Sequence, residues 1–392
     1  MFRILVADKL GLAGLRQLEE ESDVTVDVKT GLSKTELCSL IPAYDALLVR
    51  SSTQVDADLL SVAEKLRVIG RAGMGVDNID VAVATARGIL VMNTPGVNSI
   101  ATAEHTILLM LAAARHTAEA HQSVHQGEWR RSDFTGVQLY RKVLGLIGFG
   151  RIARHVAKRA RTFDMEVIAF DPYVSEEVGQ EMGIQLVDLE ELLAQADVVS
   201  LHASLSAETL HILNAETLAK TKAGVIIINP SRGQLVDEQA LADALVSGQV
   251  RAAAIDVYNE EPPGTDHPLI GLANVLHTPH LGASTEEAQR DVSIQIVEQV
   301  VDALRNDDFR NSVNMPFPVG PEYDSVLPYL QLGEKIGALQ FHMADAPVRD
   351  VELELLGDTA TEFAKPIATG VLKGLMMNII ADPVNYINAP VL

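Results

Sequence analysis

Two series of short apolar runs, each alternating with helix-like segments, restrict the fold of this chain more than any other feature. The first series consists of FRILVAD, DVTVDV, DALLVR, LRVIGR and GILVMN. The second consists of KVLGLIG, MEVIAFD, DVVSLH, AGVIIIN, VRAAAID and NVLHTPH. Strands that alternate with helices form parallel sheets with helices packed on their faces. The sequence therefore predicts an α/β protein with two Rossmann-like, doubly wound parallel-sheet domains.

The helical patterns between these runs predict the domain limits. Helix-forming residues extend from Ser99 to about His125, between the two series of strands. Another long helical pattern, TEEAQRDVSIQIVEQVVDALRND, follows the last strand and could return the chain to the first domain. We therefore expect a discontinuous first domain from residues 1–98 and 285–312, and a second domain from residues 99–284.

The C-terminal tail has a different composition. Prolines become frequent around NMPFPVGPEY, which indicates a linker. The tail then shows a helical pattern in LPYLQLGEKIGALQF, an alternating strand pattern in VRDVELELLG and a second helical pattern in EFAKPIATGVLKGLMM. Residues 316–392 are thus predicted to form a small α+β accessory domain. It ends at NAPVL without an obvious cap, which leaves open that this domain is truncated.

Charge and cysteine content exclude several classes of function. The chain has 53 acidic and 31 basic residues and a net charge of −22, which disfavours binding to nucleic acid or anionic membranes. Its single cysteine, Cys38, cannot form an intramolecular disulfide, and no cluster has the spacing of metal ligands. The best apolar run, residues 106–114, is too short to span a bilayer. We expect a soluble cytoplasmic protein without a metal.

A nucleotide-binding motif opens the second series. Gly148, Gly150 and Ala153 match G-x-G-x-x-G/A directly after a strand and at the start of a helix. Asp171 ends the next strand, 21 residues after Gly150, where a carboxylate would bind the ribose hydroxyls and repel a 2′-phosphate. The pattern predicts NAD as the cofactor. Arg151 would either contact the pyrophosphate or be a solvated arginine at the helix end.

Polar residues follow three later strands of the second series. INPSRGQLVD carries Arg232, IDVYNEEPP carries Glu261, and HTPHLGAST carries His280. Parallel strands place such residues at one edge of the sheet, where ligands bind. A cation, a carboxylate and a titratable ring are what hydride transfer from a secondary alcohol requires. Taken singly, each has a structural explanation: a helix-capping arginine, a solvated loop glutamate and a hydrogen-bonded loop histidine.

These motifs together resemble the NAD-dependent D-2-hydroxyacid dehydrogenase family. GFGRIA, RAGMGVDNID and PHLGAST are the most specific parts, and the resemblance covers residues 2–315. It implies that His280 is the base that takes the hydroxyl proton, that Glu261 orients the ring, and that Arg232 holds the substrate carboxylate. It also implies that a cleft lies between the two domains, that the first domain binds substrate and that the second binds NAD. The remaining cofactor contacts that it implies are Ile152, Ala203, Pro230, Ser231, Asp256, Gly282 and Ala283.

Arginines in the first domain indicate an anionic substrate. Arg50 and Arg71 follow predicted strands, and Gly73 and Gly75 form a turn whose backbone N–H groups could bind a carboxylate. The resemblance implies that Arg50 and Arg71 grip a substrate phosphate and that Arg130 reaches in from a partner subunit, with neighbouring Arg131 as an alternative. Solvated surface arginines remain the structural explanation.

Several arginines in an acidic protein favour a phosphorylated substrate. Within the family, the chain resembles the members that oxidise 3-phospho-D-glycerate to 3-phosphohydroxypyruvate, the first step of phosphorylated serine biosynthesis. The alternatives are a glyoxylate or hydroxypyruvate reductase, or another D-2-hydroxyacid dehydrogenase, and, less favoured, a non-catalytic NADH-sensing protein. The apolar helix near residues 102–114 favours a homodimer or homotetramer. Regulation by serine is left open.

Overall fold

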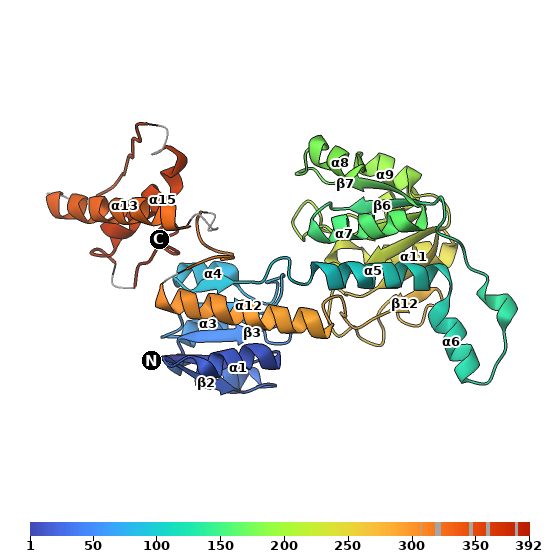
Figure 1. Cartoon of the computed structure of the whole chain (residues 1–392), viewed down its shortest axis with the longest axis horizontal. Coiled ribbons are helices and arrows are strands. Elements are labelled where there is room, and N and C mark those ends of the chain that lie inside the picture. Colours follow the sequence, from blue (N-terminus) through green and yellow to red (C-terminus); the bar gives the residue numbers. More distant parts are fainter. Residues whose placement is uncertain (307, 318–322, 345–347, 358–360, 381–382) are drawn as a thin grey trace. The chain divides into compact units, whose positions relative to one another are not determined.

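The computed structural model describes residues 1–392 except 307, 318–322, 345–347, 358–360 and 381–382. The chain forms two compact units, Met1–Val97 with Gln289–Leu392, and Asn98–Ala288. In Figure 1 the first unit runs through blue at its start and orange to red at its end, and the second through cyan, green and yellow. The domain limits expected from the sequence stay predictions, as does an independent domain at 316–392.

The first unit contains a five-stranded parallel sheet in the order β2-β1-β3-β4-β5. Its strands are β1 (Phe2–Val6), β2 (Val24–Val28), β3 (Ala46–Val49), β4 (Val68–Arg71) and β5 (Leu90–Met92). The helices between them are α1 (Leu12–Glu20), α2 (Lys34–Leu40), α3 (Ala57–Val62) and α4 (Val81–Ala86). Each run of the first series forms a strand, so this part of the fold prediction is confirmed.

Both faces of this sheet are buried. In β1, Ile4 and Val6 point into one apolar layer, and Leu5 points into the layer on the opposite face. Helix α12 (Glu286–Arg305) supplies Ile296 and Val300 to the first of these layers. Because a parallel strand is covered on both faces, it needs apolar residues at consecutive positions rather than an alternating pattern. This requirement explains the continuous apolar runs in the sequence.

The second unit contains a seven-stranded parallel sheet in the order β12-β11-β10-β9-β6-β7-β8. Its strands are β6 (Val143–Ile147), β7 (Glu166–Phe170), β8 (Gln185–Leu186), β9 (Val198–Leu201), β10 (Val225–Asn229), β11 (Val250–Ile255) and β12 (Val275–His277). The strand order reverses between β6 and β9, which is where a doubly wound sheet binds its ligand. The six predicted strands are confirmed. Strand β8 was not predicted, because its two residues are too few to show a pattern.

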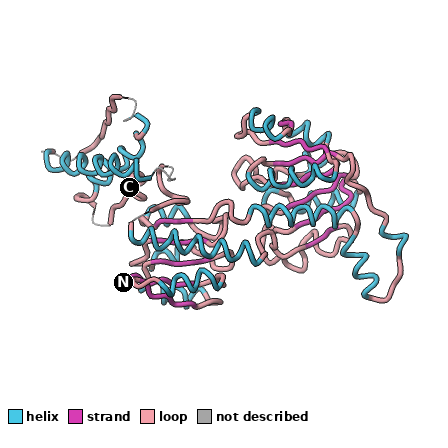
Figure 2. Tube along the Cα trace, viewed as in Figure 1, coloured by secondary structure: helices cyan, strands magenta, loops and turns pink. Residues whose placement is uncertain are grey.

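Helices cover both faces of the second sheet (Figures 1 and 2). On one face lie α5 (Ser99–Ala114) and α7 (Arg151–Ala160), and the opposite face is covered by α9 (Leu189–Gln195), α10 (Ala215–Ala219) and α11 (Glu238–Ser247). The unit also contains α6 (Thr117–His125) and α8 (Glu176–Met182). The helix-forming stretch from Ser99 to about His125 forms two helices, because His116 has φ +51° and separates α5 from α6.

The described residues also form short 3₁₀ helices: η1 (Ile41–Ala43), η2 (Arg131–Phe134), η3 (Arg161–Phe163) and η4 (Gly233–Leu235). In the part of the chain that the structure describes, none of the helices has the length and apolar character of a membrane-spanning segment.

The C-terminal segment contains α13 (Tyr323–Met343) and α15 (Ala364–Met376), which pack closely against each other. A Cβ atom on Gly337 or Gly374 would lie 2.1 or 2.0 Å from a backbone oxygen of the facing helix, so only glycine permits this approach. The strand predicted over 348–357 is not formed. Leu353 and Leu355 instead pack against the apolar face of α15, which explains the alternating pattern without a strand.

Candidate active site

The two motif glycines after β6 have different surroundings. Gly148 has φ +89°, and a Cβ atom there would lie 2.5 Å from the backbone nitrogen of Ala203. Gly150 is the N-cap residue of α7, and a Cβ atom there would have no heavy atom within 4 Å. The third motif residue, Ala153, is completely buried. Open space therefore lies at the N-terminus of α7, where backbone N–H groups can bind a pyrophosphate.

Asp171 connects the end of β7 to this glycine loop. Its Oδ2 accepts a hydrogen bond from the backbone N–H of Phe149 at 2.9 Å, and its Oδ1 accepts one from Tyr173 at 2.9 Å. A carboxylate has further lone pairs that can accept hydrogen bonds from ribose hydroxyls. Nearby, Arg151 is exposed at the start of α7, and Ile152 is partly buried against the core. This arrangement fits NAD.

The segment after β10 contacts the segment after β9. The hydroxyl of Ser231 donates to the carbonyl of Ala203 at 2.9 Å, while Pro230 is buried beside it. Asn229 at the end of β10 fixes the turn, because its side chain accepts from Ser231 N–H at 3.1 Å and donates to the Arg232 carbonyl at 2.8 Å. Residues predicted from separate motifs thus meet at one edge of the sheet.

His280 and Glu261 form a hydrogen-bonded pair. Nδ1 of His280 lies 2.8 Å from Oε2 of Glu261, and Oε1 of Glu261 accepts the backbone N–H of Tyr258 at 3.1 Å. Burial raises the pKa of Glu261, but the hydrogen bond and charge of His280 and the N–H of Tyr258 outweigh it, so the pKa is below its usual value. The carboxylate is therefore charged beside the ring at neutral pH.

Asp256 holds the backbone around His280. Its carbonyl accepts the N–H of His280 at 2.8 Å, and its carboxylate accepts N–H groups of Leu281 at 2.8 Å and Gly282 at 3.0 Å. His280 has φ +54°, a left-handed conformation that is costly for a residue other than glycine and persists where surrounding contacts impose it. Ala283 follows this turn and is partly buried.

Two residues around Asp256 were not assigned to the site from the sequence. The hydroxyl of Thr278 donates a hydrogen bond to Oδ1 of Asp256 at 2.6 Å, and Nε2 of His105 lies 3.1 Å from the same oxygen. Asp256 is fully buried, which raises its pKa, but these hydrogen bonds and that of Leu281 N–H bring the pKa below its usual value. His105 lies 151 residues before Asp256 in the chain, so no local pattern links the two residues.

In the first unit, Arg50 and Arg71 lie at the same edge of neighbouring strands. Arg50 directly follows β3, and Arg71 ends β4 opposite Val49. The side chain of Asp8 accepts a hydrogen bond from the backbone N–H of Arg50 at 2.6 Å. The side chain of Asn78 donates a hydrogen bond to the backbone carbonyl of Arg50 at 2.8 Å.

The glycines of the first unit follow β4. Gly73 has φ +141°, and a Cβ atom there would overlap the guanidinium of Arg71, with only 1.6 Å to Nη1. Gly75 is partly buried in the same turn. Arg71 therefore requires glycine at position 73 to keep its conformation.

Arg130 lies on the segment between α6 and η2. Its Nε lies 3.1 Å from a carboxylate oxygen of Glu128 and 3.8 Å from one of Asp133, and its side chain is 52% exposed. Trp129 beside it is 82% exposed. Nothing within the described chain joins Arg130 to the other predicted substrate residues, so its role stays a prediction.

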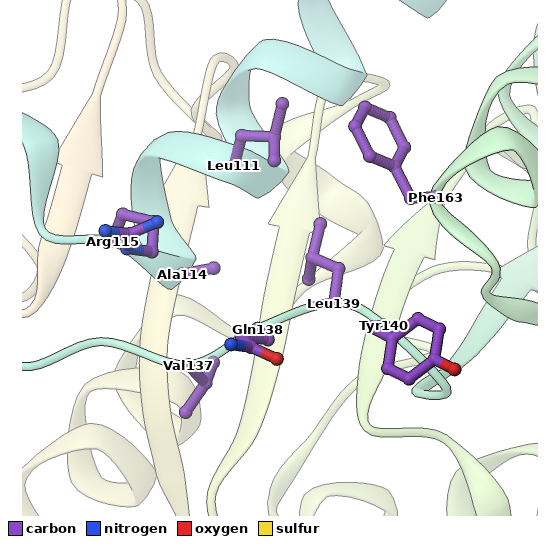
Figure 3. Close-up of a pocket in the computed structure, with 8 residues that line it drawn as sticks. All are labelled: Leu111, Ala114, Arg115, Val137, Gln138, Leu139, Tyr140 and Phe163. Carbon is purple, nitrogen blue, oxygen red and sulfur yellow. The ribbon is translucent and has the colours of Figure 1, made fainter.

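A pocket of about 250 Å³ lies at the C-terminal end of α5 (Figure 3). It is lined by Leu111, Ala114, Arg115, Val137, Gln138, Leu139, Tyr140 and Phe163. Its lining contains none of the predicted site residues. The pocket is therefore separate from the His280 and Glu261 pair.

Two family models match the chain. Residues 107–282 match the D-isomer specific 2-hydroxyacid dehydrogenase, NAD binding domain, which makes NAD the cofactor of this unit. Residues 325–392 match the D-3-phosphoglycerate dehydrogenase intervening domain.

Solved structures share the fold. The TT0316 protein from Thermus thermophilus is 36% identical, with a TM-score of 0.73 over 79% of this chain and 99% of that one. A glyoxylate reductase from Paecilomyes thermophila is 32% identical, with a TM-score of 0.72 over 80% of this chain and 98% of that one.

Curated relatives are similar along the whole chain. D-3-phosphoglycerate dehydrogenase of Methanocaldococcus jannaschii is 46% identical, covering 100% of this chain and 74% of the relative. The enzyme of the same name from Archaeoglobus fulgidus is 42% identical, covering 99% of this chain and 73% of the relative. With these relatives, both family models and the His280 and Glu261 pair, the chain belongs to the D-3-phosphoglycerate dehydrogenase family of NAD-dependent D-isomer-specific 2-hydroxyacid dehydrogenases.

Proposed function

We propose that this protein oxidises 3-phospho-D-glycerate to 3-phosphohydroxypyruvate with NAD, as the first step of serine biosynthesis. The observation that carries the chemistry is the His280–Glu261 pair, 2.8 Å apart, in the unit that carries the glycine loop. The substrate is supported by relatives named D-3-phosphoglycerate dehydrogenase that are 41–46% identical over nearly the whole chain.

His280 would act as the general base. Its Nδ1 is engaged by Glu261, which leaves Nε2 to take the proton of the substrate hydroxyl. Glu261 fixes the ring orientation and stabilises the protonated ring with its negative charge. When bound, the nicotinamide supplies a hydride acceptor. In the reverse direction His280 returns the proton as the ketone is reduced.

Arg232 would hold the substrate carboxylate. Its planar guanidinium can donate two parallel hydrogen bonds to a carboxylate, and its charge polarises the neighbouring C2 oxygen. The turn that carries it is fixed through Asn229 and Ser231. A fixed arginine orients the substrate at a lower entropic cost than a mobile one.

The substrate phosphate would bind to Arg50 and Arg71. These arginines lie at one edge of neighbouring strands, and Gly73 permits the position of the Arg71 guanidinium. We further propose that the protein is a homodimer or homotetramer and that a second copy contributes Arg130 to the phosphate site. The exposed Trp129 next to Arg130 supports a contact with another copy.

The composition of the chain also bears on where the protein acts and on whether it needs a metal. We propose a cytoplasmic location, supported by an acidic chain with the single cysteine Cys38, and catalysis without a metal. Among the described residues, no group of three or more His, Cys, Asp or Glu could hold a metal ion. A rate that falls when EDTA is added would contradict the metal-free mechanism.

The decisive experiment measures initial rates of NADH oxidation with phosphohydroxypyruvate, hydroxypyruvate, glyoxylate, pyruvate and 2-oxoglutarate. The wild type is compared with Arg50→Ala and with Arg16→Ala, which removes an exposed arginine of α1. We expect a strong preference for phosphohydroxypyruvate that collapses only in Arg50→Ala. Equal use of glyoxylate, unaffected by Arg50→Ala, would favour a glyoxylate reductase. Binding of NADH without turnover of any acid would favour an NADH sensor.

A further inference from the structure

The turn that carries Glu261 is fixed by groups outside the predicted site. Its first residue, Tyr258, is buried and donates its backbone N–H to Glu261 Oε1 at 3.1 Å. The next residue, Asn259, donates its N–H to Oε1 of Glu238 at 2.9 Å, and its carbonyl accepts from the side chain of Gln234 at 3.2 Å. The orientation of Glu261 therefore depends on a backbone segment that Glu238 and Gln234 hold.

Close packing restricts the same segment from another side. A Cβ atom on Gly233 would lie 2.0 Å from the carbonyl carbon of Tyr258 and 2.3 Å from the nitrogen of Asn259. Gly233 directly follows Arg232, so the turn that carries the cation and the turn that carries the carboxylate touch through their backbones. A displacement of residues 258–259 would disturb both.

Glu238 is well placed for this role. It is the first residue of α11, after the N-cap Asp237, and its side chain is only 11% exposed. A carboxylate at a helix N-terminus is stabilised by the helix dipole. The short loop from η4 to α11 brings it beside Asn259, which is 21 residues later in the chain. The carboxylate thus reaches the turn from a rigid element.

His267 supports Glu238 from the other side. Its Nε2 packs 2.9 Å from Glu238 Oε2 and makes no hydrogen bond there. Its Nδ1 accepts the backbone N–H of Leu269 at 3.3 Å, which holds the ring beside Glu238. The His267 ring also meets the Tyr258 ring edge-on, with centroids 5.5 Å apart.

We propose that Glu238, supported by His267, is a positioning residue that holds Glu261 in the orientation required by His280. This inference rests on the proposed function of the His280–Glu261 pair. Glu238 acts through the backbone of Asn259 and Tyr258 and touches neither reactant. Loss of its hydrogen bond would let the turn move, so that Glu261 would be in line with His280 for only part of the time.

Three substitutions at Glu238 separate this role from others. Glu238→Gln keeps an oxygen that can accept the Asn259 N–H. Glu238→Asp keeps the charge but is too short to reach it, and Glu238→Ala removes both. Glu176→Ala is the matched control, because Glu176 is also the first residue of its helix, α8, and is exposed.

Two measurements are made on each full-length variant. Steady-state kinetics with the best 2-oxo acid should show kcat lowered about tenfold in the Ala and Asp variants, with KM and the NADH Kd within about twofold of the wild type. Hydrogen–deuterium exchange should be about tenfold faster at Tyr258 and Asn259 in those two variants. The Gln variant and the Glu176→Ala control should resemble the wild type in both measurements.

The outcomes are distinguishable. Wild-type kcat in Glu238→Asp, or faster exchange without any loss of kcat, would overturn the positioning role. If the Ala variant does not fold, the contrast between the Asp and Gln variants still decides. If the wild type reduces no 2-oxo acid, the proposed function is wrong. If hydrogen–deuterium exchange at Tyr258 and Asn259 is unchanged in Glu238→Asp, Glu238 does not fix this turn, whatever the outcome for the function.

Discussion

Nδ1 of His280 lies 2.8 Å from Oε2 of Glu261, which assigns different tasks to the two ring nitrogens. A neutral ring that donates from Nδ1 to the carboxylate presents Nε2 as an acceptor. The tautomer that a general base needs is therefore the one that the hydrogen bond favours. In the proposed mechanism, Nε2 is therefore the ring atom that would take the proton of the substrate hydroxyl.

Replacing His280 with Ala should remove most turnover and leave NADH binding intact. A positioned general base contributes roughly 10²- to 10⁴-fold to the rate, and the side chain has no predicted contact with the cofactor. Steady-state kinetics and NADH fluorescence titration measure the two effects. His342→Ala, which removes an exposed histidine of α13, serves as the control. A His280→Ala enzyme with wild-type rates would refute the assignment.

Replacing Glu261 with Gln should lower kcat by roughly 10- to 100-fold, because the amide can still orient the ring but cannot stabilise its positive charge. In the wild type the Glu261 pKa lies below its usual value, since His280 and the Tyr258 N–H outweigh the effect of burial. Protonation of this carboxylate should therefore not limit the rate above about pH 5. A kcat in the Gln variant equal to that of the wild type would show that the charge is not needed.

How far the sequence predicts this site depends on whether a residue belongs to a local pattern. Gly148 and Asp171 directly follow strands, and Arg232 lies three residues after β10, so the alternation of strands and helices places them at the edge of the sheet. His105 and Glu238 carry no such signal. Each acts through a contact with a residue far away in the chain, Asp256 and Asn259 respectively, and only the folded structure reveals these contacts.

The same distinction applies to the fold. Apolar runs such as ALLV in β3 and VLGLI in β6 predict strands correctly, because burial on both faces requires them. The break between α5 and α6 was missed, since His116 is not a residue that typically ends a helix and adopts φ +51°. The alternating segment 348–357 was predicted as a strand, whereas Leu353 and Leu355 are partly buried against α15 and Leu356 is exposed.

Replacing Asp256 with Asn should reduce the free energy of unfolding at pH 7 by about 3 kcal/mol, because a buried acceptor of several hydrogen bonds becomes an amide whose N–H₂ faces donors. The folded pKa of Asp256 is lowered. Its contribution to stability is therefore present above the unfolded pKa of about 4 and is lost as the pH falls through the lower folded pKa.

The difference between the wild type and Asp256→Asn should accordingly be largest near neutral pH and shrink below about pH 4. Urea unfolding at several pH values measures it. Asp243→Asn, at an exposed position of α11, controls for the general effect of removing a charge. A difference that stays constant down to pH 2 would show that the network does not stabilise the ionised form.

Substituting Ala for the two motif glycines should separate a backbone requirement from a ligand requirement. Gly148→Ala should destabilise the fold by about 1–3 kcal/mol, because its φ is +89° and the added Cβ would lie 2.5 Å from Ala203 N. Gly150→Ala should leave the melting temperature nearly unchanged, since its Cβ meets nothing within 4 Å. That methyl group would enter the space in front of α7 and keep the pyrophosphate from the backbone N–H groups, so NADH should bind roughly tenfold or more weakly. Thermal unfolding and NADH titration of both variants test this contrast, and tight NADH binding by Gly150→Ala would place the pyrophosphate elsewhere.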